Sequence, residues 1–273
     1  MTTATATDVR KFGSLKIKRV EDIEESHGAF IALYASAGAG KTTLAADVAN
    51  YPELSPVLYM DVEGGLSVID KKLITSGKLD PVEPTKYGEI TEVKQLILQG
   101  NTNYKTVVMD NVCEVLTMCK RMVVGSDEAP TQPQWGKITN EMLKMTREWR
   151  DMARFKGINV IFNAWDSPDK DESNMVKNNI NFTPALREQF PGLVEVVGFI
   201  GFENNSRVLD FTWNPRKTQA KFRRAAGSNG MKIPLKIPYT MDNLPLGDIL
   251  KTLNFGTEWP AAKYPVRTAQ ATT

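Results

Sequence analysis

Short, nearly continuous apolar runs alternate with helical patterns along the first part of this chain. Runs rich in Val and Ile that are separated by helices are typical of parallel strands buried on both faces. The pattern therefore predicts an α/β fold in which helices flank a mainly parallel sheet. The predicted strands are residues 29–34, 56–61, 105–110 and 158–163, and the predicted helices are residues 42–50, 89–99, 111–123 and 136–155.

From about residue 190 the pattern changes to apolar segments joined by short turns. We expect residues 194–202, 207–213 and 221–223 to be strands of an antiparallel extension of the sheet. The segment 244–253 is expected to form a last amphipathic turn or two that pack against this extension.

The two ends of the chain differ in composition from the rest. Residues 1–9 are rich in Thr and Ala, and residues 260–273 contain Pro, Ala and Thr. Such composition favours poorly ordered tails. The sequence therefore predicts an N-terminal arm (1–27), one core domain (28–256) and a flexible C-terminal tail (257–273).

Composition excludes several classes of protein. With 41% hydrophobic and 24% charged residues among 273, the chain is typical of a soluble globular protein. It has neither an apolar run of the roughly 18 residues that a membrane helix needs nor a signal-peptide core, so we expect a cytoplasmic protein. Cys113 and Cys119 are expected to be reduced, buried and too far apart to bridge. The single His27 excludes a multi-histidine metal site, and the net charge of +2 requires any nucleic-acid binding to come from local clusters.

The most informative segment lies between the first predicted strand and the first predicted helix. A loop of small residues followed by Lys and Thr, placed after a strand and before a helix, binds nucleotide phosphates through backbone N–H groups and the helix N-terminus. The Lys reaches the outer phosphates, and the Thr hydroxyl binds Mg²⁺. Ala35 replaces the usual first Gly, which is tolerable if its φ is negative. The predicted ATP-binding residues are Ser36, Ala37, Gly38, Ala39, Gly40, Lys41, Thr42 and Thr43.

Two carboxylates are placed to complete a catalytic site with Lys41. Asp110 ends an apolar strand, where we expect it to orient a water on the Mg²⁺ that Thr42 binds. Glu63 follows the second strand and is placed to deprotonate the water that attacks the γ-phosphate, and Asp61 could assist it. The alternatives are a turn or cap residue for Asp110 and a polar turn for residues 61–65.

Three segments carry a resemblance to a known family: residues 61–66, 107–111 and 134–136, the last being Gln-Trp-Gly at the start of a long helix. They resemble the RecA-type ATPase core over residues 28–225. More narrowly, they are similar to phage AAA-family nucleotide-binding proteins that act in single-strand annealing or recombination. The resemblance implies a RecA-like P-loop fold, Mg²⁺-dependent ATP hydrolysis with Glu63 as catalytic glutamate, single-stranded DNA as a ligand, and a homo-oligomer, either filament or ring. It also implies the host cytoplasm and, as a further partner, a single-stranded-DNA-binding or replication protein.

The end of the fourth strand is the expected position of a sensor of the γ-phosphate. Asn163 stands there, although it could equally be a strand-end hydrogen-bonding residue. The resembling recombinases commonly have Gln at the next position, which here is Ala164. This departure puts the coupling of hydrolysis to DNA binding in doubt.

A block of seven basic side chains and no acidic one spans residues 211–240. By the resemblance, Arg216 and Lys217 match basic residues that reach a neighbouring subunit's γ-phosphate. We expect Lys221, Arg223 and Arg224 to contact DNA phosphates. A solvated basic face is the alternative.

The loop expected after the fourth strand begins with an acidic run from Asp166, which repels phosphate. Only the following part, with Lys177 and the possible stacking group Phe182, has a composition that could contact a DNA strand. The alternative is a mobile connection.

Two other functions use the same phosphate loop. A small-molecule kinase would carry an Arg-rich lid, often near the middle of the chain, but the middle loop here is acidic. A non-catalytic ATP-dependent adaptor for replication proteins is compatible with Ala164. We therefore favour the ATPase and keep both alternatives.

Overall fold

A computed structural model describes most of the chain. The described residues are 11–12, 15–16, 28–100, 102–126, 128–170, 174, 176–203, 206–212, 220–222 and 233–265. Of the expected N-terminal arm it describes only a short antiparallel pair, β1 (Lys11–Phe12) and β2 (Leu15–Lys16).

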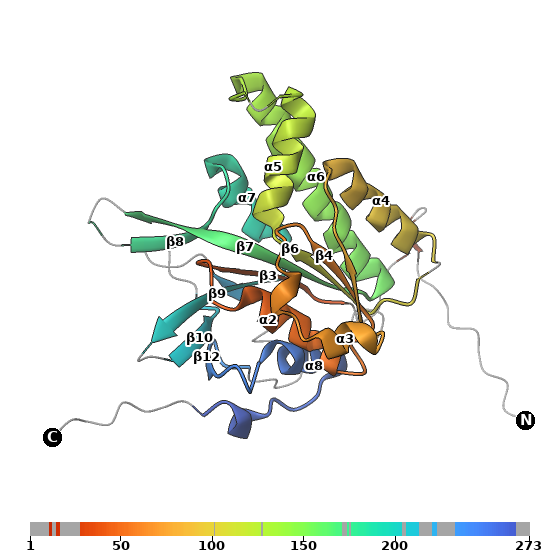
Figure 1. The fold of residues 1–273 in the computed structure, drawn as a ribbon, viewed down its shortest axis with the longest axis vertical. Helices are drawn as coiled ribbons and strands as arrows, with labels where there is room; N and C mark the ends of the chain where they lie inside the picture. The colour runs from red at the N-terminus through yellow and green to blue at the C-terminus, as the bar shows by residue number, and fades with distance from the viewer. Residues whose placement is uncertain are drawn as a thin grey trace, which may run out of the picture.

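Within the described residues, ten strands form one large sheet (Figure 1). The strand order along its main path is β12-β10-β9-β3-β7-β6-β4-β5. Outside this path, β11 pairs with β9, and β8 pairs with β7. Pairs from β5 to β9 along this path are parallel, whereas β8, β10, β11 and β12 pair antiparallel. The strands are β3 (Phe30–Ala35), β4 (Val57–Asp61), β5 (Leu79–Val82), β6 (Thr106–Asp110), β7 (Asn159–Lys170), β8 (Val176–Ile180), β9 (Val196–Glu203), β10 (Ser206–Asp210), β11 (Lys221–Phe222) and β12 (Lys236–Tyr239).

Helices cover both faces of the sheet, as Figure 1 shows. One face carries α4 (Tyr87–Leu98), α5 (Val112–Val124), α6 (Gln132–Lys156) and α7 (Pro184–Leu193). The other face carries α2 (Lys41–Ala46), α3 (Lys71–Thr75) and α8 (Leu246–Phe255), with the 3-10 turns η1 (Asp47–Asn50) and η2 (Leu66–Val68). The expected mainly parallel α/β fold with a C-terminal antiparallel extension is confirmed.

The alternation of side chains along β3 explains why its sequence is apolar throughout. Ile31 and Leu33 pack into the core under α2 and α8, while Phe30 and Tyr34 pack into the core under α6. Both faces of a central parallel strand are buried, so every residue of the strand must be apolar or partnered.

The strand register assembles the polar strand ends at one edge of the sheet. Asp61 pairs with Asp110, and Asp110 pairs with Asn163. On the other side of β7, Ala35 pairs with Trp165. Residues more than a hundred positions apart therefore lie beside the phosphate loop, where ligands bind in open α/β sheets.

The expected acidic loop after Asn163 is instead part of a β-hairpin. Strand β7 continues to Lys170, and β8 returns antiparallel to it, with Asp166 opposite Ile180 and Asp169 opposite Lys177. The strand could not be predicted from the acidic sequence, because the second half of β7 is only partly buried and contains no apolar run. The short β5, β12, α3 and α7 were also missed.

The expected flexible tail is corrected over its first part. Trp259 and Tyr264 are buried and stack with ring centroids 5.0 Å apart. The Tyr264 hydroxyl donates to Asp248 Oδ2 at 2.7 Å and so ties the segment to α8. Residues 257–265 thus pack on the core, and residues 266–273 lie outside the described residues.

Two further expectations concern cysteines and membranes. Cys113 and Cys119 are free and buried, as predicted. Searched over the described part of the chain, no helix is long and apolar enough to cross a bilayer.

Candidate nucleotide-binding site

The phosphate loop is the turn from β3 into α2. Gly38 and Gly40 have φ values of +77° and +98°, the left-handed region that side chains rarely adopt, and Gly40 is the N-cap of α2. Ala35 is the last residue of β3, and among the described residues only Asn174 is a non-glycine residue with positive φ. The methyl group of Ala35 therefore needs no strained backbone, as the sequence analysis required.

The Lys41 ammonium lies inside this loop. Lys41 is 6% exposed, and its Nζ donates to the carbonyl oxygens of Ala35 at 3.0 Å and Ser36 at 3.1 Å. Burial lowers the pKa of Lys41, and the nearby carboxylates of Asp110 and Glu63 oppose this shift. A buried cation facing two carboxylates is suited to hold an anion together with a metal.

One carboxylate oxygen of Asp110 accepts hydrogen bonds, and the other has no partner among the described residues. Its Oδ2 accepts hydrogen bonds from Thr42 Oγ1 at 2.6 Å and from the Tyr59 hydroxyl at 2.5 Å. Its Oδ1 is buried and has no hydrogen-bond partner among the described residues. Both amide atoms of the neighbouring Asn163 are also buried and unpaired within that set.

The buried polar atoms without hydrogen-bond partners indicate whether the site fits Mg²⁺ and a phosphate. A buried polar group without a partner costs about 1–3 kcal/mol, so several of them at one place indicate a missing ligand. Mg²⁺ prefers carboxylate, hydroxyl and water oxygens and usually needs only one or two protein ligands. Asp110 and Thr42 supply such oxygens, and the residues present therefore fit the ion.

Asp61 has a different role from the one considered in the sequence analysis. Its Oδ1 accepts from the backbone N–H groups of Gly64 at 2.8 Å and Gly65 at 2.9 Å, and its Oδ2 accepts from Leu66 at 2.9 Å. Both carboxylate oxygens are thus used to build the turn that follows β4. Asp61 thereby fixes the backbone on which Glu63 stands.

Glu63 is exposed but held by two donors from different elements. Asn111 Nδ2 donates to Glu63 Oε2 at 3.2 Å, and Trp165 Nε1 donates to Glu63 Oε1 at 3.2 Å. The Glu63 backbone N–H donates to the Asp110 carbonyl oxygen at 3.2 Å. The carboxylate therefore has a defined position beside the strand end that carries Asp110.

Three residues at this site escaped the sequence analysis as site residues. Tyr59 lies within an apolar strand in the sequence, and Trp165 directly follows Ala164, the residue that departs from the recombinase pattern. Arg207 lies on β10, and its Nε donates to the Ala39 carbonyl oxygen at 3.2 Å. No local signal links Arg207 to a loop 168 positions earlier, because the antiparallel extension alone brings it there.

The model of a protein family described as an AAA domain matches residues 27–224, which is more than half of the chain. The chain belongs to this AAA-domain family. The family and the mainly parallel sheet around the phosphate loop agree with the expected P-loop core.

Two solved structures that are similar to this AAA domain share little sequence with it. The RadB recombinase is 16% identical with a TM-score of 0.45, and covers 70% of this chain and 84% of its own. The flagellar accessory protein FlaH from Methanocaldococcus jannaschii is 10% identical with a TM-score of 0.46, and covers 79% and 86%. Likenesses this weak assign no function. The search of curated proteins found no match.

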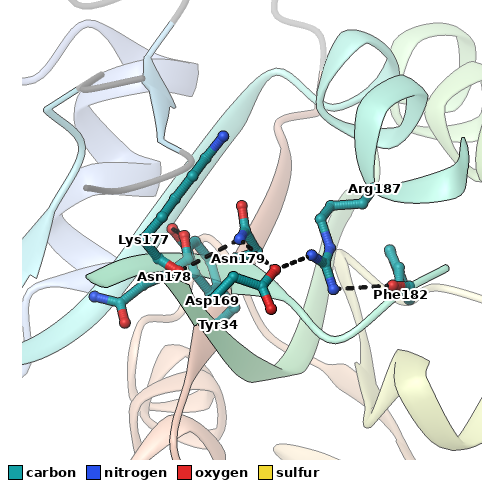
Figure 2. A network of polar contacts seen from close by, with 7 residues as sticks. All are labelled: Tyr34, Asp169, Lys177, Asn178, Asn179, Phe182 and Arg187. Atoms are coloured by element: carbon teal, nitrogen blue, oxygen red, sulfur yellow. Dashed lines mark hydrogen bonds and ion pairs between the residues drawn. The ribbon is translucent and has the colours of Figure 1, made fainter. Parts of the chain in front are cut away.

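The β7–β8 hairpin of the AAA domain is braced against the phosphate loop and against α7. Ser36 Oγ donates to Asp166 Oδ2 at 3.0 Å, and the Tyr34 hydroxyl donates to the Asn178 carbonyl oxygen at 3.3 Å. Figure 2 shows Arg187 paired with Asp169, which also accepts from Asn179 Nδ2 at 3.1 Å. The described residues of the hairpin therefore contact both the phosphate loop and α7.

The structure revises two of the candidate DNA-binding residues. Phe182 is 4% exposed and packs edge-on against Phe190 at 5.0 Å, so its ring has no free face for a base. Lys221 Nζ donates to the carbonyl oxygens of Pro191 at 2.7 Å and Val194 at 2.8 Å, where its charge stabilises the end of α7. Lys177 is half-buried on β8. The other candidates, Arg216, Lys217, Arg223 and Arg224, lie outside the described residues.

Proposed function

We propose that this AAA domain binds ATP with Mg²⁺ at the phosphate loop and hydrolyses it. The observation that carries the proposal is the cluster of unpaired buried atoms, Asp110 Oδ1 and both amide atoms of Asn163, beside Lys41 and Thr42. A nucleotide with its metal would supply the partners that these atoms lack. Glu63, held at the rim of the same cluster, is the group that can act on water.

Each residue has one task in the proposed reaction. Backbone N–H groups of residues 36–41 and the Lys41 ammonium hold the phosphates. Thr42 and Asp110 would hold Mg²⁺, which when bound neutralises charge that develops on the phosphate oxygens. Glu63 orients a water and accepts its proton as the water oxygen bonds to the γ-phosphorus and the bond to the leaving ADP oxygen breaks. Asn163 donates to the γ-phosphate.

We further propose that the protein works in the cytoplasm as a homo-oligomer, filament or ring, on single-stranded DNA in annealing or recombination of the phage type. The support is the basic block of residues 211–240 and the resemblance of the sequence to such proteins. Arg216 and Lys217 would act on a neighbouring subunit's γ-phosphate, and Arg223, Arg224 and Lys177 would contact DNA phosphates. A single-stranded-DNA-binding or replication protein is the proposed further partner.

The test combines ATP binding and turnover in two variants and a control. Lys41→Ala should abolish nucleotide binding, measured by calorimetry. Glu63→Gln should bind Mg²⁺-ATP with unchanged affinity but hydrolyse it at least roughly 100-fold more slowly, since general-base catalysis contributes that much or more. Glu92→Gln, an exposed glutamate on α4, should change neither. Unchanged turnover in Glu63→Gln would remove the assigned base.

A second experiment separates the candidate functions. Turnover is measured with and without a single-stranded oligonucleotide, whose binding is followed by fluorescence anisotropy. Stimulation by the oligonucleotide agrees with the proposal. Turnover that needs a small acceptor would point instead to a kinase, and ATP binding without any turnover would point to an adaptor.

A further inference from the structure

The contact between Trp165 and Glu63 joins two parts of the molecule that are far apart in sequence. Glu63 stands on the turn after β4, while Trp165 lies on β7 where the hairpin leaves the sheet. The indole N–H donates to Glu63 Oε1 at 3.2 Å, and Asn111 donates to the other oxygen. One donor on each oxygen fixes both the position of the carboxylate and the direction in which it faces.

The Trp165 side of this contact is the rigid one. Its backbone is paired with Ala35 at the start of the phosphate loop, and its carbonyl oxygen accepts from the Asn181 N–H at 2.9 Å. Its side chain is half-buried, whereas Glu63 is exposed. Because the backbone of Trp165 is held on both sides and its ring is less exposed than the carboxylate, the indole sets the place of Glu63.

Position along the strand explains why this residue reaches the site. Trp165 follows Asn163 by two residues on β7, at the strand end that lies beside the phosphate loop. Its ring packs against the same hydrophobic cluster that buries Ala164, and its indole N–H is left to donate to Glu63. The next residue, Asp166, accepts from Ser36 of the phosphate loop. The base of the hairpin thus contacts both the loop that holds phosphate and the group that acts on water.

We propose that Trp165 is a positioning residue that orients Glu63 for attack of water, so that the β7–β8 hairpin sets the rate of hydrolysis. The inference rests on the proposed ATP hydrolysis and on the role of Glu63 in it. Trp165 does not itself touch the reacting atoms. A shift of the hairpin base would move the indole and release one oxygen of the carboxylate.

The test is Trp165→Phe, which keeps an aromatic ring and removes the N–H donor. A hydrogen bond to a charged group is lost, so we expect kcat for ATP hydrolysis to fall about tenfold or more, with KM for ATP and its calorimetric affinity changed less than twofold. Trp165→His, which restores an N–H donor, should recover part of kcat. Trp135→Phe, a half-buried tryptophan on α6, is the matched control and should leave kcat unchanged.

A double variant shows whether Trp165 acts through Glu63. Because the proposed role requires the carboxylate, Trp165→Phe should cause no further loss of kcat in the Glu63→Gln background. A full additional loss would assign Trp165 a role independent of Glu63 and overturn the inference. If Trp165→Phe does not fold, Trp165→His and Trp165→Leu give the same comparison of a side chain with and without the donor.

The outcomes separate the inference from the function on which it rests. Wild-type turnover that Trp165→Phe leaves unchanged overturns the inference and leaves the ATPase in place. Equal changes in kcat and KM would indicate general damage to the site and also overturn it. Wild-type protein that binds ATP but does not hydrolyse it overturns both.

Discussion

The hydroxyl of Tyr59 stabilises the fold from inside the candidate site, and its removal gives a measurable prediction. Tyr59 is fully buried, and its hydroxyl donates to Asp110 Oδ2 at 2.5 Å. Burial raises the pKa of Tyr59 well above its usual value, and the negative charge of Asp110 raises it further, so the hydroxyl keeps its proton at every pH of interest. In Tyr59→Phe, Asp110 would keep only the hydrogen bond from Thr42.

The expected loss follows from the charge and burial of the bond. Hydrogen bonds to charged groups contribute about 1.5–3 kcal/mol, and the remaining carboxylate is left buried with less compensation. We expect Tyr59→Phe to lower the free energy of unfolding by about 2 kcal/mol. At an m-value of about 2 kcal/mol per molar, the urea midpoint falls by about 1 M.

The chain offers a matched control for this substitution. The Tyr104 hydroxyl donates to Asp80 Oδ2 at 2.9 Å, which is the same kind of bond in a solvent-exposed position. Because surface interactions of this kind contribute little, Tyr104→Phe should lower stability by less than about 1 kcal/mol. Both variants are unfolded in urea without nucleotide and followed by circular dichroism. Equal losses in the two variants, or no loss in Tyr59→Phe, would refute the reasoning that burial next to Asp110 decides the energy.

Two further predictions concern packing and thiols. Gly247→Ala places a methyl group 2.0 Å from the Tyr51 ring and should lower the free energy of unfolding in urea by about 1–3 kcal/mol. The control Gly136→Ala places its methyl group with nothing within 4 Å and should not destabilise its helix. Equal stability of the two variants would contradict the close packing at Gly247. Burial raises the pKa of both Cys113 and Cys119 to about 12, so neither thiol should react with a disulfide reagent at pH 8 until the protein unfolds. Since the unfolded thiols ionise near pH 8.5, their contribution to the free energy of unfolding is full below that pH and declines above it. The unfolding midpoint of the double variant Cys113→Ala/Cys119→Ala should therefore fall less between about pH 8.5 and 10 than that of the wild-type protein. Rapid native-state labelling would disprove the burial of these thiols.

Local features of this protein could be predicted from the order of its residues. The phosphate loop depends on neighbours within one turn: glycines at two left-handed positions, then Lys41 and Thr42 at the start of a helix. The main parallel strands could be predicted for a related reason. A strand buried on both faces must be apolar at each position, and such a run is visible without knowledge of its partners.

Contacts between distant segments escaped prediction because no local pattern encodes them. Tyr59 and Trp165 became site residues only when the register set β4, β6, β7 and β3 side by side. Phe182 lost its role as a base-stacking group for the same reason, since its burial depends on α7 folding over it.

Composition was also a poor guide wherever polar side chains found partners. The acidic segment after Asn163 forms a strand because β8 pairs with it and Arg187 neutralises Asp169. Residues 257–265 pack because Tyr264 reaches Asp248. Neighbouring residues set backbone preferences, whereas the energy that orders a polar segment comes from groups that only the folded chain brings within reach.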